Sequence, residues 1–246
     1  IDEVIRHSVS KLSHAHFVAN EEARNRLLQL GENSKSIFTI GSPDMDVMIS
    51  KDLPTIQAVK ERYDIMFDAY NILLFHPVTT EVEDIPRQIN NILASLDKSG
   101  QKYVIIYPNN DHGSQEILRA YDGAKENKNY RFIPSMRFEY FLTLMKHAGF
   151  LIGNSSAGVR ETPFYGVPSI NIGTRQNKRA QSKTILNCDY HSASIDDAIQ
   201  KIPTVPREKI DLFGSGGSAE AFIKVLCDEK FWALPNQQQF IDMDTA

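Results

Sequence analysis

Short apolar runs alternate with amphipathic stretches along most of the chain. The apolar runs predict buried strands at residues 72–75, 103–107, 130–133, 150–152, 169–172 and 184–186. Apolar positions at helical spacing predict helices at about residues 82–97, 114–123, 138–147, 157–165 and 194–201. Because strands that alternate with helices form a parallel sheet covered on both faces, we expect a doubly wound, Rossmann-like α/β fold.

A shorter series of the same kind opens the chain. The elements expected there are a helix over the first twelve residues, a strand at 16–18, a helix at 21–30 and a strand at 37–40. The stretch from Ser50 to Tyr70 is polar and contains Pro54, so a hinge between two domains is expected within it. A last helix is expected near residues 219–228, followed by a polar tail.

Composition narrows the class of protein. Of the 246 residues, 41% are hydrophobic and 24% are charged, which is typical of a globular chain and excludes a disordered one. No apolar run approaches the ~20 residues of a membrane-spanning helix. The net charge of −4 is unlike that of a protein that binds nucleic acid or an anionic membrane, so an anionic ligand must be held by local geometry.

The cysteines and potential metal ligands are few. Cys188 and Cys227 lie far apart and belong to no CxxC motif or Cys/His cluster, which argues against a structural zinc. They are interpreted as free thiols in a reducing, cytoplasmic compartment, with one disulfide between them left open. Asp111 and His112 are of metal-ligand types, but no further ligand stands at suitable spacing. Neither a metal nor another cofactor is therefore expected.

The most informative loop runs from Gly153 to Glu161, directly after an expected strand. Small residues between a strand and a helix let backbone N–H groups approach a phosphate, and a helix start carries a partial charge of ~+0.5. Ser155 and Ser156 add hydroxyl donors, and Glu161 can accept both hydroxyls of a ribose. The alternative is that one serine caps the helix and Glu161 complements its dipole. The strand–turn–helix context favours the ligand.

Two more loops follow strands of the same sheet, where doubly wound folds bind their ligands. His76 directly follows one strand and can donate to a phosphate or transfer a proton, and the alternative is a core or capping histidine. Asn109 follows the next strand and is placed to contact a ligand. Asp111 or Ser114, further along that loop, is expected to cap the following helix.

A fourth loop, after the expected strand at residues 169–172, carries Arg175. A guanidinium beside the two serines can clamp a diphosphate with two hydrogen bonds, and the alternative is an ordinary surface arginine. Arg160 precedes Glu161 and points elsewhere on the expected helix, so a structural ion pair accounts for it equally well.

Taken together, these loops resemble the hydrolysing UDP-N-acetylglucosamine 2-epimerases, which make N-acetylmannosamine for bacterial sialic acid synthesis. The epimerase half of the animal bifunctional epimerase/kinase is similar. The resemblance extends from the first residue to about residue 230. The segments that carry it are residues 1–7 with Lys11-Leu12-Ser13, Gly41-Ser42-Pro43, and residues 76–80, 107–114, 154–161 and 173–176. The non-hydrolysing 2-epimerases look different, with an Arg-rich segment in place of residues 76–80 and Ser-Gly-Gly in place of Ser155-Ser156-Ala157.

The resemblance implies a two-domain, glycosyltransferase-B-like fold with a nucleotide sugar in its cleft. Residues 1–50 are then the last part of a first Rossmann-like domain, residues 51–228 the UDP-binding domain, and residues 229–246 a polar tail that crosses back. The residues implied to contact UDP are His76, Asn109, Met136, Ser155, Ser156, Glu161 and Arg175. The backbone of Met136 is implied to face the uracil. The family's acid/base carboxylates precede Ile1, so the chain alone is expected to be inactive.

The family reaction is anti elimination of UDP from UDP-N-acetylglucosamine, followed by addition of water to the glycal with inversion at carbon 2. His76 is expected to stabilise the leaving group or to transfer a proton. The expected partners are the nucleotide sugar, UDP and further copies of the chain in a homodimer or homotetramer. Three alternatives stay open: a 2-epimerase of a UDP-diacetamido-trideoxy or GDP-linked sugar, a glycosyltransferase of the same architecture, and a non-catalytic nucleotide-sugar-binding module.

Overall fold

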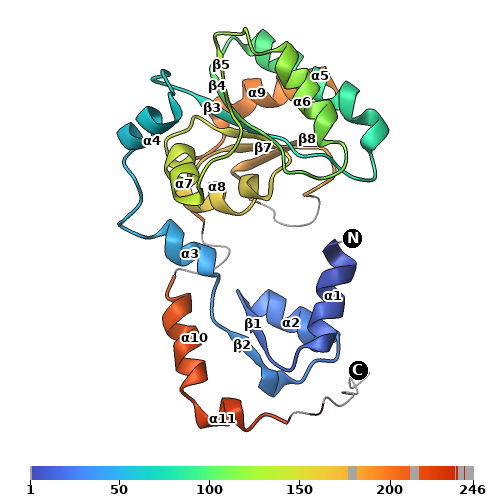
Figure 1. Cartoon of the computed structure of the whole chain (residues 1–246), viewed down its shortest axis with the longest axis vertical. Helices are drawn as coiled ribbons and strands as arrows, with labels where there is room; N and C mark the ends of the chain where they lie inside the picture. Colours follow the sequence, from blue (N-terminus) through green and yellow to red (C-terminus); the bar gives the residue numbers. More distant parts are fainter. Residues whose placement is uncertain (1, 177–181, 211–215, 236, 238–240, 242–246) are drawn as a thin grey trace. The chain divides into compact units, whose positions relative to one another are not determined.

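The computed structural model describes residues 2–176, 182–210, 216–235, 237 and 241, and it divides into two compact units (Figure 1). Unit 1 consists of residues 1–51 together with residues 213–246, and unit 2 of residues 52–212. The division between Lys51 and Asp52 falls inside the polar stretch where the sequence places a hinge. In the described part of the chain, no helix is long and apolar enough to cross a lipid bilayer.

Unit 2 is built on six parallel strands. They are β3 (Asn71–Leu74), β4 (Tyr103–Ile106), β5 (Tyr130–Ile133), β6 (Leu151–Gly153), β7 (Ser169–Ile172) and β8 (Ile185–Cys188). Their order in the sheet is β5-β4-β3-β6-β7-β8. The chain moves outward from β3 to β5 and then returns to the other side of β3, which makes the junction of β3 and β6 the topological switch point. The predicted doubly wound α/β fold is confirmed.

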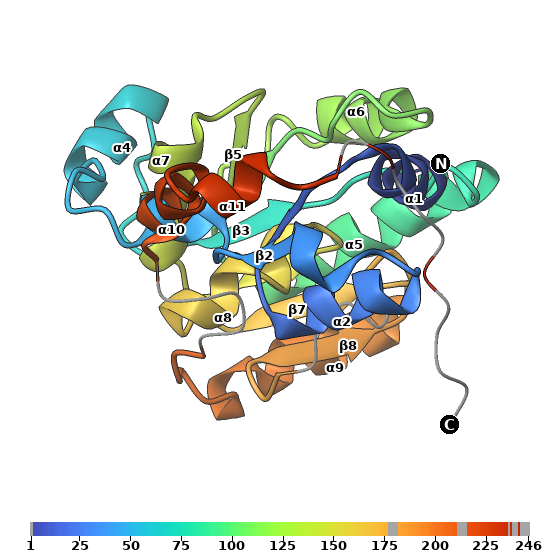
Figure 2. The same cartoon turned by 90° about the horizontal axis from the view of Figure 1, so that it is seen from below.

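Helices cover both faces of this sheet (Figures 1 and 2). On one face α5 (Ile85–Ser99) packs against α6 (Ser114–Gly123) and α9 (Ser192–Lys201). On the other, α7 (Phe138–Lys146) packs against α4 (Ile56–Tyr63) and α8 (Glu161–Tyr165). The 3-10 turns of unit 2 are η2 (Val82–Asp84), η3 (Ser156–Gly158) and η4 (Ile202–Thr204). A parallel sheet covered in this way leaves only its edges and loops for a ligand.

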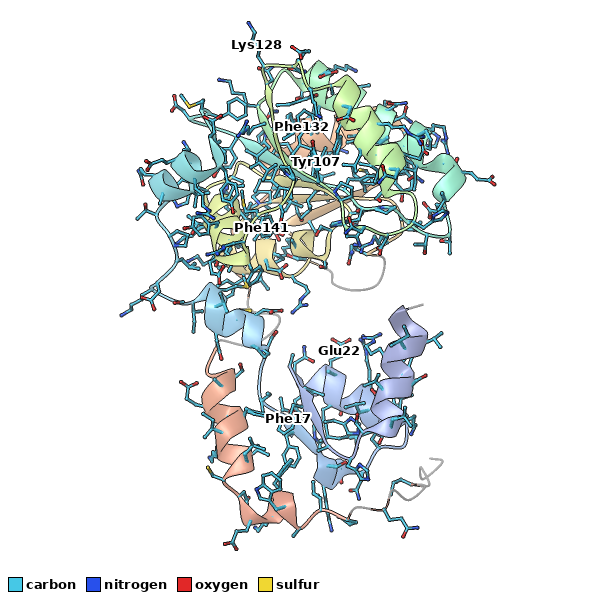
Figure 3. All side chains as sticks on the ribbon, in the orientation of Figure 1. Phe17, Glu22, Tyr107, Lys128, Phe132 and Phe141 are labelled. Atoms are coloured by element: carbon cyan, nitrogen blue, oxygen red, sulfur yellow. The ribbon has the colours of Figure 1, made fainter. Side chains whose placement is uncertain are left out.

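A core cluster lies between the sheet and the helices α5, α6 and α9. Leu73, Phe75 and Ile105 belong to it and are fully buried, because alternate residues of a strand point to the same face. Burying each such side chain contributes about 1.5–3 kcal/mol. Tyr107 and Phe132, labelled in Figure 3, extend this cluster with ring centroids 6.4 Å apart. The apolar runs read from the sequence are thus the strands that form this core.

The prediction of a continuous helix over residues 157–165 is wrong. The chain forms the 3-10 turn η3 and then the separate, five-residue helix α8. Pro163 has no N–H, so a continuous helix would lack one of its hydrogen bonds here. The carbonyl of Gly158, the last residue of η3, accepts a hydrogen bond from the Thr162 hydroxyl at 2.9 Å, across the break between η3 and α8. Any ligand at this loop therefore meets individual N–H groups and not the end of a long helix.

Smaller differences concern element boundaries. The helix expected from residue 82 begins as the 3-10 turn η2 and continues as α5 from Ile85, while the last strand lies over Ile185–Cys188 instead of residues 184–186. The polar stretch expected as a hinge also contains α4. Thr55 caps this helix by accepting a hydrogen bond from its third residue, and Val59 alone anchors it as a fully buried side chain.

Unit 1 contains a two-stranded parallel sheet of β1 (His16–Val18) and β2 (Ile37–Thr39), beside which α2 lies in Figure 2. Its other elements are α1 (Asp2–Leu12), α2 (Glu21–Gln29), η1 (Ser34–Ser36), α3 (Pro43–Met48), α10 (Ser218–Leu226) and α11 (Glu229–Trp232). Phe17, labelled in Figure 3, packs on Phe38 of β2 and on Phe222 of α10, with ring centroids 5.5 and 4.7 Å apart. The aromatic cluster joins α10 to this sheet.

The expectation that residues up to 228 belong to the UDP-binding domain is therefore corrected. Residues 213–228 group with unit 1. Besides the aromatic cluster, the Asp46 carboxylate of α3 holds the start of α10. It accepts hydrogen bonds from the Ser218 hydroxyl at 2.6 Å and from the backbone N–H groups of Ser218 and Ala219 at 3.0 Å each. A helix cap supplied from 172 positions away leaves no local pattern in the sequence.

Candidate nucleotide-binding site

The predicted site residues all lie in unit 2, in the segments that follow the carboxyl ends of the strands. Their positions are His76 after β3, Asn109 after β4, Met136 after β5, Ser155 and Ser156 after β6, Glu161 at the start of α8, and Arg175 after β7. Because the strands are parallel, the carboxyl ends of all five share one edge of the sheet. The loops of His76 and of the two serines flank the switch point, where doubly wound folds bind ligands.

Asn154, to which the sequence reasoning gave no role, joins three of these loops. Its side chain is fully buried; Oδ1 accepts a hydrogen bond from the His76 N–H at 2.7 Å, and Nδ2 donates to the His76 carbonyl at 2.8 Å. Its backbone oxygen accepts from Arg175 Nη1 at 3.1 Å and from Gln176 Nε2 at 2.9 Å. The one signal for this joining role in the sequence is that Asn154, a side-chain amide, directly follows a buried strand.

Gly153 makes this junction possible. Its φ of +137° lies in a region that favours glycine, and a Cβ at this position would lie 2.1 Å from the carbonyl oxygen of Leu74. The ends of β6 and β3 can therefore approach closely enough for the Asn154 side chain to bond to the His76 backbone. The glycine of this loop serves strand packing and not only ligand access.

His76 is half-buried and uncharged at neutral pH. Burial, together with the positive charge of Arg175, lowers the pKa of His76 to about 4, against an opposing contribution from Asp111. Its Nδ1 accepts a hydrogen bond from the backbone N–H of Asn109 at 3.1 Å. The Asn109 side chain donates to the Asp111 carboxylate, and it also contributes to raising the pKa of His76, against the effect of burial.

In the serine loop the structure shows the capping alternative for Ser155, and ligand binding stays a prediction. Ser155 is buried and its Oγ accepts a hydrogen bond from the Ala157 N–H at 3.3 Å, which confirms the capping alternative for this residue. A hydroxyl that accepts one bond still has its proton to donate, so capping does not prevent ligand binding. Ser156 is half-buried. Glu161 is buried and is the first residue of α8, which is separate from the 3-10 turn of the serines.

A second link holds the Arg175 loop. The Thr174 hydroxyl donates to one carboxylate oxygen of Glu81 at 2.7 Å, and Gln88 Nε2 donates to the other at 3.0 Å. Gly173 lies against the ring of Tyr190, which would be 2.1 Å from a Cβ at this position. The loops after β3 and β7 are thus tied together twice, through Asn154 and through Glu81.

Unit 1 has two hollows of its own, of about 430 and 690 Å³. They are lined by residues of that unit, among them Lys11, Glu32 and Phe231, and by none of the predicted site residues. The donors suited to an anion lie together in unit 2, so the candidate site is assigned there.

A parallel sheet in this strand order, with polar loops joined at its switch point, defines a doubly wound α/β protein with a candidate ligand site at the carboxyl ends of its strands. The family model described as UDP-N-acetylglucosamine 2-epimerase matches residues 1–227, and the chain belongs to this family. The UDP-N-acetylglucosamine 2-epimerase of Neisseria meningitidis serogroup B is 47% identical over 248 residues, which cover 99% of this chain and 66% of that protein.

Two further relatives bear on the comparison. The GDP/UDP-N,N'-diacetylbacillosamine 2-epimerase (hydrolyzing) of Campylobacter jejuni is 34% identical over 212 residues, covering 82% of this chain and 53% of that protein. The crystal structure of the Methanocaldococcus jannaschii UDP-GlcNAc 2-epimerase in complex with UDP-GlcNAc and UDP superposes with a TM-score of 0.71 at 20% identity, covering 88% of this chain and 61% of that one. This likeness shows the glycosyltransferase-B-like fold. The chain spans between 50% and 66% of the length of five curated relatives that it matches.

Proposed function

We propose that the intact protein is a hydrolysing UDP-N-acetylglucosamine 2-epimerase, which converts UDP-N-acetylglucosamine to UDP and N-acetylmannosamine for the synthesis of sialic-acid-type sugars. One observation carries the proposal most: in a chain of this family, Asn154 joins His76 and Arg175 at the switch point, where donors suit a diphosphate. The identity of 47% to the Neisseria enzyme supports the substrate, and the hydrolysing Campylobacter relative supports the reaction type.

In this proposal, several of the predicted site residues stabilise UDP as the leaving group. A base takes the proton from carbon 2, the electron pair of that C–H bond forms the double bond of the glycal, and the bond between carbon 1 and the diphosphate oxygen breaks with its electron pair leaving on UDP. Charge that develops on the diphosphate is stabilised by the Ser155 and Ser156 donors, the Arg175 guanidinium and the His76 N–H. Water then adds to the glycal with inversion at carbon 2.

The remaining predicted residues serve the nucleoside in this proposal. Glu161 accepts the two ribose hydroxyls, the Met136 backbone faces the uracil, and Asn109 lies beside the diphosphate. Since a charged acceptor of two hydroxyls contributes about 1.5–3 kcal/mol, Glu161 is the residue whose loss should weaken nucleotide binding most clearly.

Calorimetric titration with UDP tests the binding half on the 246-residue chain. Glu161→Ala is expected to weaken binding about ten- to hundredfold and Ser156→Ala less, since a neutral hydrogen bond contributes about 1 kcal/mol. His14→Ala, which alters a residue of unit 1, is the control and should bind as the unmodified chain does. Equal affinity in all three variants would contradict the proposed site.

Turnover is tested on the intact gene product, because the chain spans only part of its relatives. The proposal requires release of UDP together with a free, 2-epimerised sugar. A 2-epimerised sugar still attached to UDP would identify a non-hydrolysing enzyme, and UDP release that depends on an acceptor would identify a glycosyltransferase. A panel that includes UDP- and GDP-diacetamido-trideoxy sugars decides the substrate, which the Campylobacter relative makes the second candidate.

A further inference from the structure

His76 is held from two directions, through its backbone and through its ring. Its backbone N–H and carbonyl are both bonded to the buried amide of Asn154, and its Nδ1 accepts the backbone N–H of Asn109 at 3.1 Å. The two contacts come from the loops after β6 and β4, on either side of the loop after β3. Both the position and the rotation of the imidazole are therefore determined by neighbouring strands.

The contact at Nδ1 also determines where the ring carries its proton. A backbone N–H is only a donor, so Nδ1 must present its lone pair, and a neutral imidazole then carries its single proton on Nε2. Within the described part of the chain, Nε2 has no hydrogen-bond partner. The protein thus orients one specific N–H group and leaves it for a ligand.

We propose that the Asn109 backbone N–H acts as a positioning group that fixes the Nε2–H tautomer of His76, so that the neutral ring donates to a diphosphate oxygen and does not act as a base. The inference rests on the proposed function for the identity of the ligand. It narrows the role of His76, for which the sequence left phosphate donation and proton transfer both open. A ring with Nδ1 occupied and Nε2 protonated has no free lone pair with which to remove a proton from carbon 2.

The charges around the His76 imidazole favour its neutral form as the hydrogen-bond donor. Arg175 already supplies a cation next to Asn154, and its charge and the burial of the ring both disfavour a second positive charge on His76. Asp111 and the Asn109 side chain act in the opposite direction, but burial and Arg175 outweigh them. The oxygen that His76 meets is therefore contacted by a fixed dipole that needs no change of protonation during the reaction.

Nitrogen NMR of the ligand-free, ¹⁵N-labelled 246-residue chain tests the tautomer directly. Of the seven histidines, His76 is assigned by the loss of its signals in His76→Gln. At neutral pH we expect an unprotonated Nδ1, coupled through the hydrogen bond to the Asn109 amide nitrogen, and a protonated Nε2. A protonated Nδ1 would overturn the inference.

Two variants separate the backbone from the side chain of Asn109. Asn109→Ala keeps the N–H and should preserve the tautomer and the coupling, whereas Asn109→Pro removes the N–H and should yield a mixture of tautomers. If Asn109→Pro unfolds the chain, the spectrum of the unmodified protein still decides the question. A single Nε2–H tautomer in a folded Asn109→Pro variant would show that another group fixes the ring and would overturn the role of Asn109.

UDP titration tests the donor role. His76→Gln retains an N–H donor and should keep most of the affinity, while His76→Phe should lose about ten- to hundredfold, the value of a hydrogen bond to a charged acceptor. Equal affinity of His76→Phe and the unmodified chain would overturn the donor role while leaving the proposed function intact. If the unmodified chain fails to bind UDP at all, the proposed function fails and the ligand part of this inference with it.

Discussion

Lowering the pH should destabilise unit 2 through His76. The pKa of His76 is about 4 in the folded chain, against about 6.5 for an exposed histidine, because of burial and the charge of Arg175. Between these two values the unfolded chain binds a proton that the folded chain excludes. The stability linked to His76 is therefore complete above about pH 6.5 and is lost as the pH falls toward 4.

The size of the effect follows from the two pKa values. A difference of about 2.5 corresponds to about 3 kcal/mol when the unfolded chain is fully protonated and the folded ring is not. At pH 5, where titration of the unfolded histidine is nearly complete, the linkage amounts to about 2 kcal/mol. A loss of this size is a substantial part of the stability of an ordinary domain, about 5–15 kcal/mol.

Urea unfolding at pH 7 and pH 5 measures this loss, with His76→Asn as the matched variant. Its Oδ1 can still accept the Asn109 N–H, but it does not titrate in this range. Carboxylates with lowered pKa values, such as Asp46, contribute to both proteins and cancel in the comparison. The unmodified chain should lose about 2 kcal/mol more than the variant, and an equal loss in both would refute the reasoning.

Three further substitutions test the links described above. Asn154→Ala leaves the backbone N–H and carbonyl of His76 without partners and should cost about 2–4 kcal/mol in urea unfolding, with weaker UDP binding; unchanged stability would contradict the link. Gly173→Ala places a Cβ 2.1 Å from the Tyr190 ring at a φ of +75° and should cost at least about 1 kcal/mol, so an unaltered melting temperature would contradict the contact. Asp46→Ala should cost about 1–2 kcal/mol by uncapping α10, and Asp46→Asn, which keeps one acceptor oxygen, should cost less; the reverse order would contradict the capping role.

The sheet of unit 2 could be predicted from the sequence because its strands are buried on both faces. Ile72 and Leu73 point to opposite sides and are both fully buried, so the run is apolar throughout and has no amphipathic alternation. The ends of the elements were harder to predict, since local hydrogen bonds decide them. Pro163 is a local signal against a continuous helix over residues 157–165, although the spacing of the apolar residues favours one.

The candidate site could likewise be predicted only in part. Its loops could be found because ligand position in a doubly wound fold follows from the strand ends, which the sequence reveals. The residue that joins the loops could not, because the partners of Asn154 lie at positions 76, 175 and 176. The cap that Asp46 provides to α10 is a similar case. Hydrogen bonds between distant segments produce no period or motif in a single sequence.

The same hydrogen bonds separate residues that hold the site from residues that would contact the ligand. Asn154 uses Oδ1, Nδ2 and its backbone oxygen on the protein and is fully buried, so it acts through the loops it joins. Removing it should therefore lower stability and UDP affinity together. Glu161 and Ser156 would meet the ligand directly, so their loss should lower affinity with a smaller change in stability. The ratio of the two effects, measured on the same variants, distinguishes a scaffold residue from a binding residue without any structure of the complex.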